Sequence, residues 1–275
     1  MPFNPANVLN LQNLDVPIYR IFPLFRFEEM MARKELVLVK PASWTDQYEG
    51  FLFKMRAVIS GQNVGVGPLL EKIYSQCWML CSDSEAMWHM YSHPERLPQK
   101  WLHRTVYKFS RWLNGEHTHQ GVKVRTTPRK LFEAFVDNTC VFEDLCYFMG
   151  KVEYWQTTDI DDLMADPSQV QALLLSPDGK GHVIASLIKR VAFEHEQEVR
   201  IIFVANRDDF DESQNSFYRF PITPNALFEG VALDPRLTAA ECADTEKRIR
   251  NAGFLGSIIQ SKINMSPNYT VHLNP

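Results

Sequence analysis

Apolar residues recur along this chain with two different periods, one helical and one strand-like. Between Leu24 and Arg33 they follow helical spacing, whereas 35–39 has the apolar composition of a strand. The apolar runs 76–81 and 194–204 predict buried strands, the second entered through three carboxylates. Further strands are expected at 18–22, 121–125, 150–155, 231–234 and 269–273, and further helices at 51–60, 128–137, 181–190 and 239–251.

The two kinds of element mix without the regular alternation of a doubly wound fold, which predicts the α+β class. No internal repeat and no linker interrupts the pattern, so a single domain over 17–275 is expected. The Asn- and Pro-rich residues 1–16 are interpreted as an N-terminal arm, and residues at about 92–120 as a basic helical insertion.

The run that begins at Glu194 carries the first candidate chemistry. On a strand, Glu196, Glu198 and Arg200 share one face. Either solvent surrounds these charges at a strand edge, or a ligand uses them. Two glutamates without a nearby His or Asp are a weak ligand set, so no metal is predicted. A carboxylate can also hold a sugar hydroxyl and stabilise an oxocarbenium-like centre, as glycoside chemistry requires.

Four further side chains are candidates on the strength of their positions. Arg20 on the first predicted strand indicates pairing with a phosphate or with a structural acid. Ser43 lies in a polar turn, where such residues often bond only the local backbone. Trp88 and Tyr91 are three residues apart on one helix face, either in the core or as a stacking platform.

The stretch 95–130 differs from the rest of the chain because it is strongly basic. Five cations fall at intervals of four, four, four and three, which places them on one helical face. Acids at i±4 do not balance them, and aromatic residues are interleaved, so the face is either a solvated stripe or a nucleic-acid surface. The five cations are Arg96, Lys100, Arg104, Lys108 and Arg111.

Composition narrows the class of protein further. The chain has 275 residues and a formal net charge of −4, which argues against a protein that coats nucleic acid with its whole surface. Its 5 cysteines form no C-x-x-C pair and are interpreted as reduced thiols. Neither a signal peptide nor an apolar run long enough for a bilayer is visible, so we expect a cytoplasmic protein without membrane contact.

The order of these motifs resembles the bacterial family known as domain of unknown function 2971. The resemblance rests on Tyr19-Arg20 in a first strand, Met87-Trp88 with Tyr91, and the late Glu196-x-Glu198-x-Arg200, and it covers roughly 17–235. The chain departs from the family in two places. The turn 44–49 keeps only the acids of the family's motif, and the link between Tyr91 and the next strand is much longer.

This order is also similar to that of ADP-ribosyltransferases, which implies a split antiparallel sheet core with surrounding helices and NAD as substrate. The resemblance implies a bacterial toxin of a toxin–antitoxin or anti-phage system, with RNA, DNA or protein as acceptor and an antitoxin as possible partner. An NAD glycohydrolase and a non-catalytic nucleic-acid-binding module are the alternatives. The implied NAD-binding residues are Tyr19, Arg20, Ser43 and Trp88, and the implied catalytic residues are Glu198, Glu196 and Tyr91.

Overall fold

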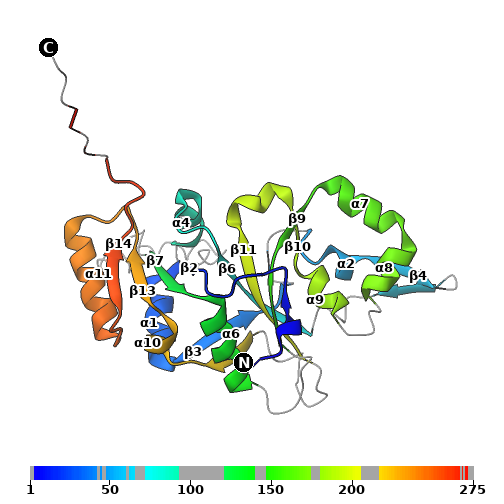
Figure 1. Cartoon of the computed structure of the whole chain (residues 1–275), viewed down its shortest axis with the longest axis horizontal. Coiled ribbons are helices and arrows are strands. Elements are labelled where there is room, and N and C mark those ends of the chain that lie inside the picture. Colours follow the sequence, from blue (N-terminus) through cyan, green and yellow to red (C-terminus); the bar gives the residue numbers. More distant parts are fainter. Residues whose placement is uncertain are drawn as a thin grey trace, which may run out of the picture. The chain divides into compact units, whose positions relative to one another are not determined.

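The chain divides into two units. Figure 1 labels their helices and strands. A computed structural model describes residues 3–41, 44, 48–59, 62–65, 72–92, 121–139, 147–174, 180–205, 217–266, 268 and 270–271. Unit 1 comprises 1–20, 34–82 and 126–227. Unit 2 comprises 21–33, 83–125 and 228–275.

The sheet of unit 1 is built around strand β11 (Glu198–Val204). This strand lies between β6 (Ile73–Met79) and β8 (Tyr147–Lys151) and runs antiparallel to both. Its β-branched residues suit a pleated surface, and its first five residues are all buried. A strand covered on both faces normally carries apolar side chains throughout. Glu198 and Arg200 are therefore unusual occupants of this position.

Shorter strands extend this sheet. β1 (Val8–Leu9) runs parallel to β8, so residues of the predicted N-terminal arm take part in unit 1. β3 (Glu35–Val39) pairs antiparallel with β12 (Phe217–Pro221) and meets β6 at one residue pair. β2 (Ile18–Pro23) also meets β6, where Tyr19 pairs with Met79.

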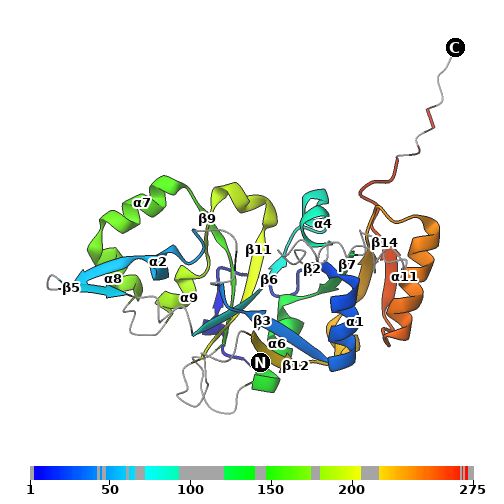
Figure 2. The same ribbon diagram turned by 180° about the vertical axis from the view of Figure 1, so that it is seen from behind.

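Helices and small sheets complete unit 1. A hydrophobic cluster that includes Phe148 and Ile202 packs with apolar residues of three helices, α7 (Thr157–Ala165), α8 (Pro167–Leu174) and α9 (Gly181–Ala185). Figures 1 and 2 show these helices close together. Strands β9 (Glu153–Trp155) and β10 (Ile188–Arg190) form a separate parallel pair. The other elements are η1 (Pro5–Asn7), α2 (Phe51–Lys54), β4 (Arg56–Ile59), β5 (Gln62–Gly65), α6 (Pro128–Thr139), η3 (Val191–Glu196) and α10 (Pro224–Leu227).

Within its described residues, unit 2 combines paired strands with three helices. β13 (Gly230–Leu233) pairs antiparallel with β7 (Gly121–Thr126) and parallel with β14 (Ser257–Gln260). α1 (Leu24–Arg33) packs against α11 (Ala239–Asn251), and the two helices are joined by an Arg248–Glu28 ion pair of 2.7 Å. The third helix is α4 (Glu85–Tyr91), whose first turn is capped by the Ser84 side chain.

Most predicted elements are confirmed, and three predictions are wrong. The predicted helix 51–60 ends at Lys54, because 56–59 instead pairs with β5 in a hairpin. The predicted helix 181–190 ends at Ala185, and 188–190 forms β10 beside β9. The strand predicted from Glu194 begins only at Glu198. The strand predicted at 269–273 lies mostly outside the described residues.

The α+β class is confirmed, since mainly antiparallel sheets are flanked by helices in both units. Within the described ranges, no helix combines the length and apolarity that a bilayer crossing requires.

Candidate functional site

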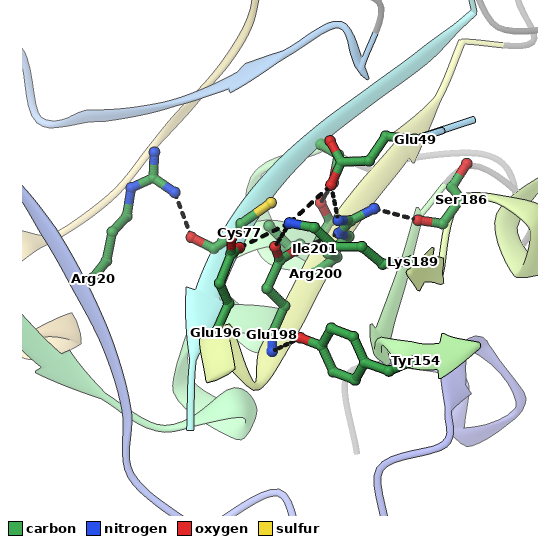
Figure 3. A network of polar contacts seen from close by, with 11 residues as sticks. Arg20, Glu49, Cys77, Tyr154, Ser186, Lys189, Glu196, Glu198, Arg200 and Ile201 are labelled. Atoms are coloured by element: carbon green, nitrogen blue, oxygen red, sulfur yellow. Dashed lines mark hydrogen bonds and ion pairs between the residues drawn. The ribbon is translucent and has the colours of Figure 1, made fainter. Parts of the chain in front are cut away.

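A cluster of charged side chains lies at the start of β11 in unit 1 (Figure 3). Glu198 and Arg200 point to the same face of this strand, as strand geometry predicts. Arg200 is only 1% exposed, and all three nitrogens of its guanidinium group donate hydrogen bonds. Its Nε donates to Glu198 Oε2 (2.7 Å), its Nη1 to the Ser186 carbonyl (2.6 Å) and its Nη2 to Glu49 Oε1 (2.7 Å). The Trp44 ring lies 4.4 Å from the guanidinium carbon.

Glu196 reaches the cluster from a different backbone element. It is the last residue of the 3-10 helix η3, and Gln197 then adopts a left-handed conformation with φ 45° before the strand begins. The Gln197 carbonyl accepts a hydrogen bond from Leu80 N (3.0 Å), which fixes this turn against the end of β6. The interpretation that Glu196 shares a strand face with Glu198 is therefore wrong, although both residues join one cluster.

Lys189 brings the carboxylates together. Its Nζ lies 2.8 Å from Glu196 Oε2, 2.6 Å from Glu198 Oε1 and 3.0 Å from Glu49 Oε1. An ammonium has three N–H donors, so these three contacts can use all of them. The Phe193 ring lies 4.8 Å from the same nitrogen and covers it further. Lys189 was not among the residues singled out from the sequence.

Glu49 completes the cluster from the segment before α2. Its Oε1 accepts from both Lys189 and Arg200, and the residue is 5% exposed. The sequence placed Glu49 in a polar turn but assigned it no role. Its partner Arg200 is 151 residues away along the chain, so no local spacing connects the two.

Close packing of the α9–β10 turn makes these contacts possible. Gly150 on β8 pairs with Arg200, and a Cβ at this position would lie 2.4 Å from the Leu187 side chain. The missing side chain at Gly150 therefore lets the turn with Ser186 and Leu187 press against the sheet, which places the Ser186 carbonyl within reach of Arg200.

The cluster is buried, so the interpretation of Glu196 and Glu198 as a solvated strand edge is wrong. Glu196 is 5% and Glu198 4% exposed. Three carboxylates meet two cations here, so the cluster carries one excess negative charge when all five groups are ionised. One proton on a carboxylate would make it neutral, and an uncompensated buried charge is costly.

The surroundings of the two glutamates favour opposite protonation states. The pKa of Glu196 is raised to about 8 by burial, by its hydrogen bond with Glu198 and by that residue's negative charge, while Lys189 opposes the rise. Burial alone would also raise the pKa of Glu198. The charge of Arg200, the hydrogen bond with Glu196 and the charge of Lys189 outweigh burial and hold this pKa well below its usual range. The proton therefore belongs to Glu196.

The first-strand residues lie near this cluster in unit 1. Tyr19 and Glu198 both pair with Met79, so the two are at the same level of the sheet, one strand apart on either side of β6. Arg20 Nη1 donates to the Cys77 carbonyl on β6, as Figure 3 shows. Burial raises the pKa of the Cys77 thiol above its usual range, so this thiol stays protonated.

Trp88 and Tyr91 belong to helix α4 of unit 2. Trp88 is fully buried, and its indole nitrogen donates to Asp83 (2.7 Å), while Tyr91 is 42% exposed. Both belong to a different unit from Glu198. The predicted NAD-binding Ser43 lies outside the described residues, and so do the five predicted acceptor-binding cations Arg96, Lys100, Arg104, Lys108 and Arg111.

The described part of the chain contains no group of three or more His, Cys, Asp and Glu side chains arranged to hold a metal ion.

Comparison with known proteins gives only distant structural likeness. No family model and no curated protein matches the chain. DarT of Thermus sp. 2.9 in complex with NAD+ is 11% identical with a TM-score of 0.37, and the match covers 92% of this chain and 98% of that chain. The same protein in complex with carba-NAD+ is 12% identical with a TM-score of 0.36, and the match covers 91% of this chain and 98% of that chain. In complex with ADP-ribosylated ssDNA it is 10% identical with a TM-score of 0.37, and the match covers 92% of this chain and 98% of that chain. At such TM-scores the likeness carries no inference about this chain.

Proposed function

We propose that this chain is an NAD-dependent ADP-ribosyltransferase with Glu198 as its catalytic carboxylate. The observation that carries the proposal is the pair of buried glutamates on one ammonium, whose surroundings raise the pKa of one and lower that of the other. When the environments of two titratable groups push their pKa values apart, the groups are suited to different acid–base roles. The motif order around Tyr19-Arg20 and Glu196-x-Glu198-x-Arg200 supports the same assignment.

Glu198 suits the stabilisation of positive charge. When the bond between ribose and nicotinamide breaks, its electron pair leaves with the nicotinamide and positive charge develops on the ribose. A carboxylate that stays ionised at all physiological pH values stabilises that charge. Lys189 and Arg200 each occupy one position on its two oxygens. Each carboxylate oxygen has two lone pairs, and the hydrogen bond with Glu196 uses a third one of these four positions, so one remains for a ribose hydroxyl.

Glu196 suits the removal of the acceptor's proton. As the acceptor oxygen or nitrogen bonds to the ribose carbon, its proton must leave, and Glu196 accepts it when ionised. With its pKa near 8, a substantial fraction of Glu196 is ionised at neutral to mildly alkaline pH. Tyr19 and Arg20, which belong to the same unit as this pair, are proposed to bind NAD.

The acceptor is proposed to be RNA or DNA. This part rests on the basic face over 96–111, whose cations and interleaved aromatics suit a phosphate backbone and unstacked bases. A toxin that modifies nucleic acid, restrained by an antitoxin, is the setting we propose.

Incubation of the purified protein with labelled NAD and nucleic acid tests the proposal. The wild type should release nicotinamide and label the acceptor, and Glu198→Gln should lower the rate by about 100-fold or more. Glu194→Gln is the matched control, because it makes the same change at an exposed residue four positions earlier and should keep the wild-type rate. Free ADP-ribose without labelled acceptor would assign an NAD glycohydrolase, and no NAD consumption would refute the proposal.

Charge reversal tests the acceptor surface separately. Lys100→Glu with Arg104→Glu should weaken nucleic-acid binding and reduce its dependence on salt, by about one unit of slope for each phosphate that the protein no longer neutralises. Lys247→Glu, an exposed change on α11, should leave binding unchanged. Unaltered binding in the double variant would remove 96–111 from the acceptor surface.

A further inference from the structure

Lys189 stands out among the residues that the proposed chemistry does not use directly. It is 6% exposed, and its ammonium is the only group among the described residues that contacts Glu49, Glu196 and Glu198 together. Arg200 contacts two of these three carboxylates and not Glu196. One ammonium therefore contacts both glutamates of the proposed site, which also form a hydrogen bond with each other.

Strand pairing of the backbone fixes the position of Lys189. It lies in the middle of β10, paired with Tyr154 of β9. The Tyr154 hydroxyl accepts a hydrogen bond from Glu198 N (2.8 Å), so the same small sheet contacts Glu198 at its backbone and at its carboxylate. The neighbouring Arg190 stacks 4.2 Å from the Tyr48 ring, which further anchors the strand.

We propose that Lys189 is the positioning residue of this site, which holds the carboxylates of Glu49, Glu196 and Glu198 together on one ammonium. The effect of Lys189 on catalysis rests on the function proposed above, whereas its effect on the pKa values of Glu196 and Glu198 does not. Lysine suits this role because its compact ammonium directs three donors to three residues, which the planar fork of arginine cannot reproduce.

Titratable and charged groups face Lys189 from several elements of unit 1. Glu49 faces it from the segment before α2, Glu196 from η3, Glu198 with Arg200 from β11, and Tyr154 from β9. Cys77 on β6 lies beside the same groups and stays protonated. The pKa of Tyr154 is raised above its usual range, mainly by burial, so its hydroxyl stays neutral. Removing the charge of Lys189 should therefore shift the glutamates and not these neighbours.

NMR titration of glutamate carboxyl carbons in ¹³C-labelled protein tests this role without turnover. The wild type should show one carboxyl with a midpoint near 8 that is missing in Glu196→Gln. In Lys189→Met this midpoint should rise by about one pH unit or more, because a neighbouring positive charge is removed. Lys189→Arg keeps the charge without the three contacts, so its midpoint should lie between those of the wild type and Lys189→Met. An unchanged midpoint in Lys189→Met would overturn the proposal.

A second background keeps the test decisive if Lys189→Met does not fold. The double variant Glu49→Gln with Lys189→Met removes one negative and one positive charge, so the net charge of the cluster stays the same. It is compared with Glu49→Gln alone. The same upward shift is expected, and its absence overturns the proposal equally. If the wild type consumes no NAD, the proposed function fails, yet the titration still decides the role of Lys189. If it does consume NAD, Lys189→Met should lower kcat more than it changes KM.

Discussion

Tyr154 and Lys189 pair across the parallel β9–β10 sheet, and both contact Glu198. Tyr154 accepts from the Glu198 backbone N–H, and Lys189 donates to its carboxylate. Residues directly opposite in a sheet point to the same side, so the two side chains reach β11 together. Val152 N also donates to the Glu198 carbonyl (2.9 Å), so residues 152–154 contact both backbone polar groups of Glu198, while Lys189 contacts its side chain.

The Tyr154 hydroxyl should therefore contribute measurably to stability. Tyr154→Phe leaves the buried Glu198 N–H without its acceptor, which should cost about 1–3 kcal/mol. Urea denaturation followed by circular dichroism measures this as a lower midpoint with an unchanged slope. A midpoint equal to that of the wild type would mean that water or another group replaces the hydroxyl.

The stability of the protein should fall as the pH rises from about 4.5 to about 8. The pKa of Glu196 in the folded state, about 8, lies above its ordinary value of 4.5. The folded state therefore binds this proton more tightly than the unfolded state. The resulting stabilisation is complete below pH 4.5 and is lost as the pH rises through 8. Thermal unfolding between about pH 5 and 9 measures this loss as a falling Tm.

Glu196→Gln is the variant that isolates this effect. Glutamine mimics the protonated carboxyl, because its amide can donate to Glu198 while its carbonyl accepts from Lys189. The decline of Tm up to about pH 8 should largely disappear in this variant and persist in Glu194→Gln. An equal decline in Glu196→Gln would place the titrating group elsewhere. Acid pH tests the opposite shift, since the contribution of Glu198 is lost only as pH falls well below 4.5.

The sequence predicted the local part of this site and missed the part made by distant segments. Alternation along a strand placed Glu198 and Arg200 on one face, and this holds because β11 is regular from Glu198 onward. The same rule failed for Glu196, because the left-handed Gln197 lies between Glu196 and Glu198 and the regular strand begins only after it. Burial of the charges was also not predictable from the strand pattern, because their counter-ions come from elsewhere.

Lys189 illustrates why those counter-ions were missed. It lies in a strand of only three residues, inside a stretch whose composition also fits a helix, and the pairing with β9 decides between the two. Nothing in its neighbours marks it as buried. By contrast, the helices at 24–33 and 239–251 were predictable because their apolar spacing and, for the second, the capping box of Thr238 and Glu241 are local signals.

Arg200 should be the most sensitive member of the cluster to substitution. Arg200→Met removes the partner of Glu198 and Glu49 while leaving both carboxylates buried, which should cost about 3–5 kcal/mol. Arg200→Lys keeps the charge but cannot bond Glu198, Glu49 and the Ser186 carbonyl at once, so its loss of stability should be intermediate. Denaturation of the wild type and both variants measures their free energies of unfolding. Equal stability of Arg200→Met and the wild type would show that the ion pairs make no net contribution to stability.

The rate of NAD turnover should rise with pH up to about 8 and then level off. Glu196 can accept the acceptor's proton only when ionised, so below its pKa each pH unit should raise the rate about tenfold. Initial rates between about pH 5.5 and 9.5, corrected for the folded fraction at each pH, measure the profile. Glu196→Gln should lower the rate by about 100-fold or more and flatten the profile, whereas Glu194→Gln should retain it. A rate that falls with pH would instead make Glu196 a proton donor to the leaving group.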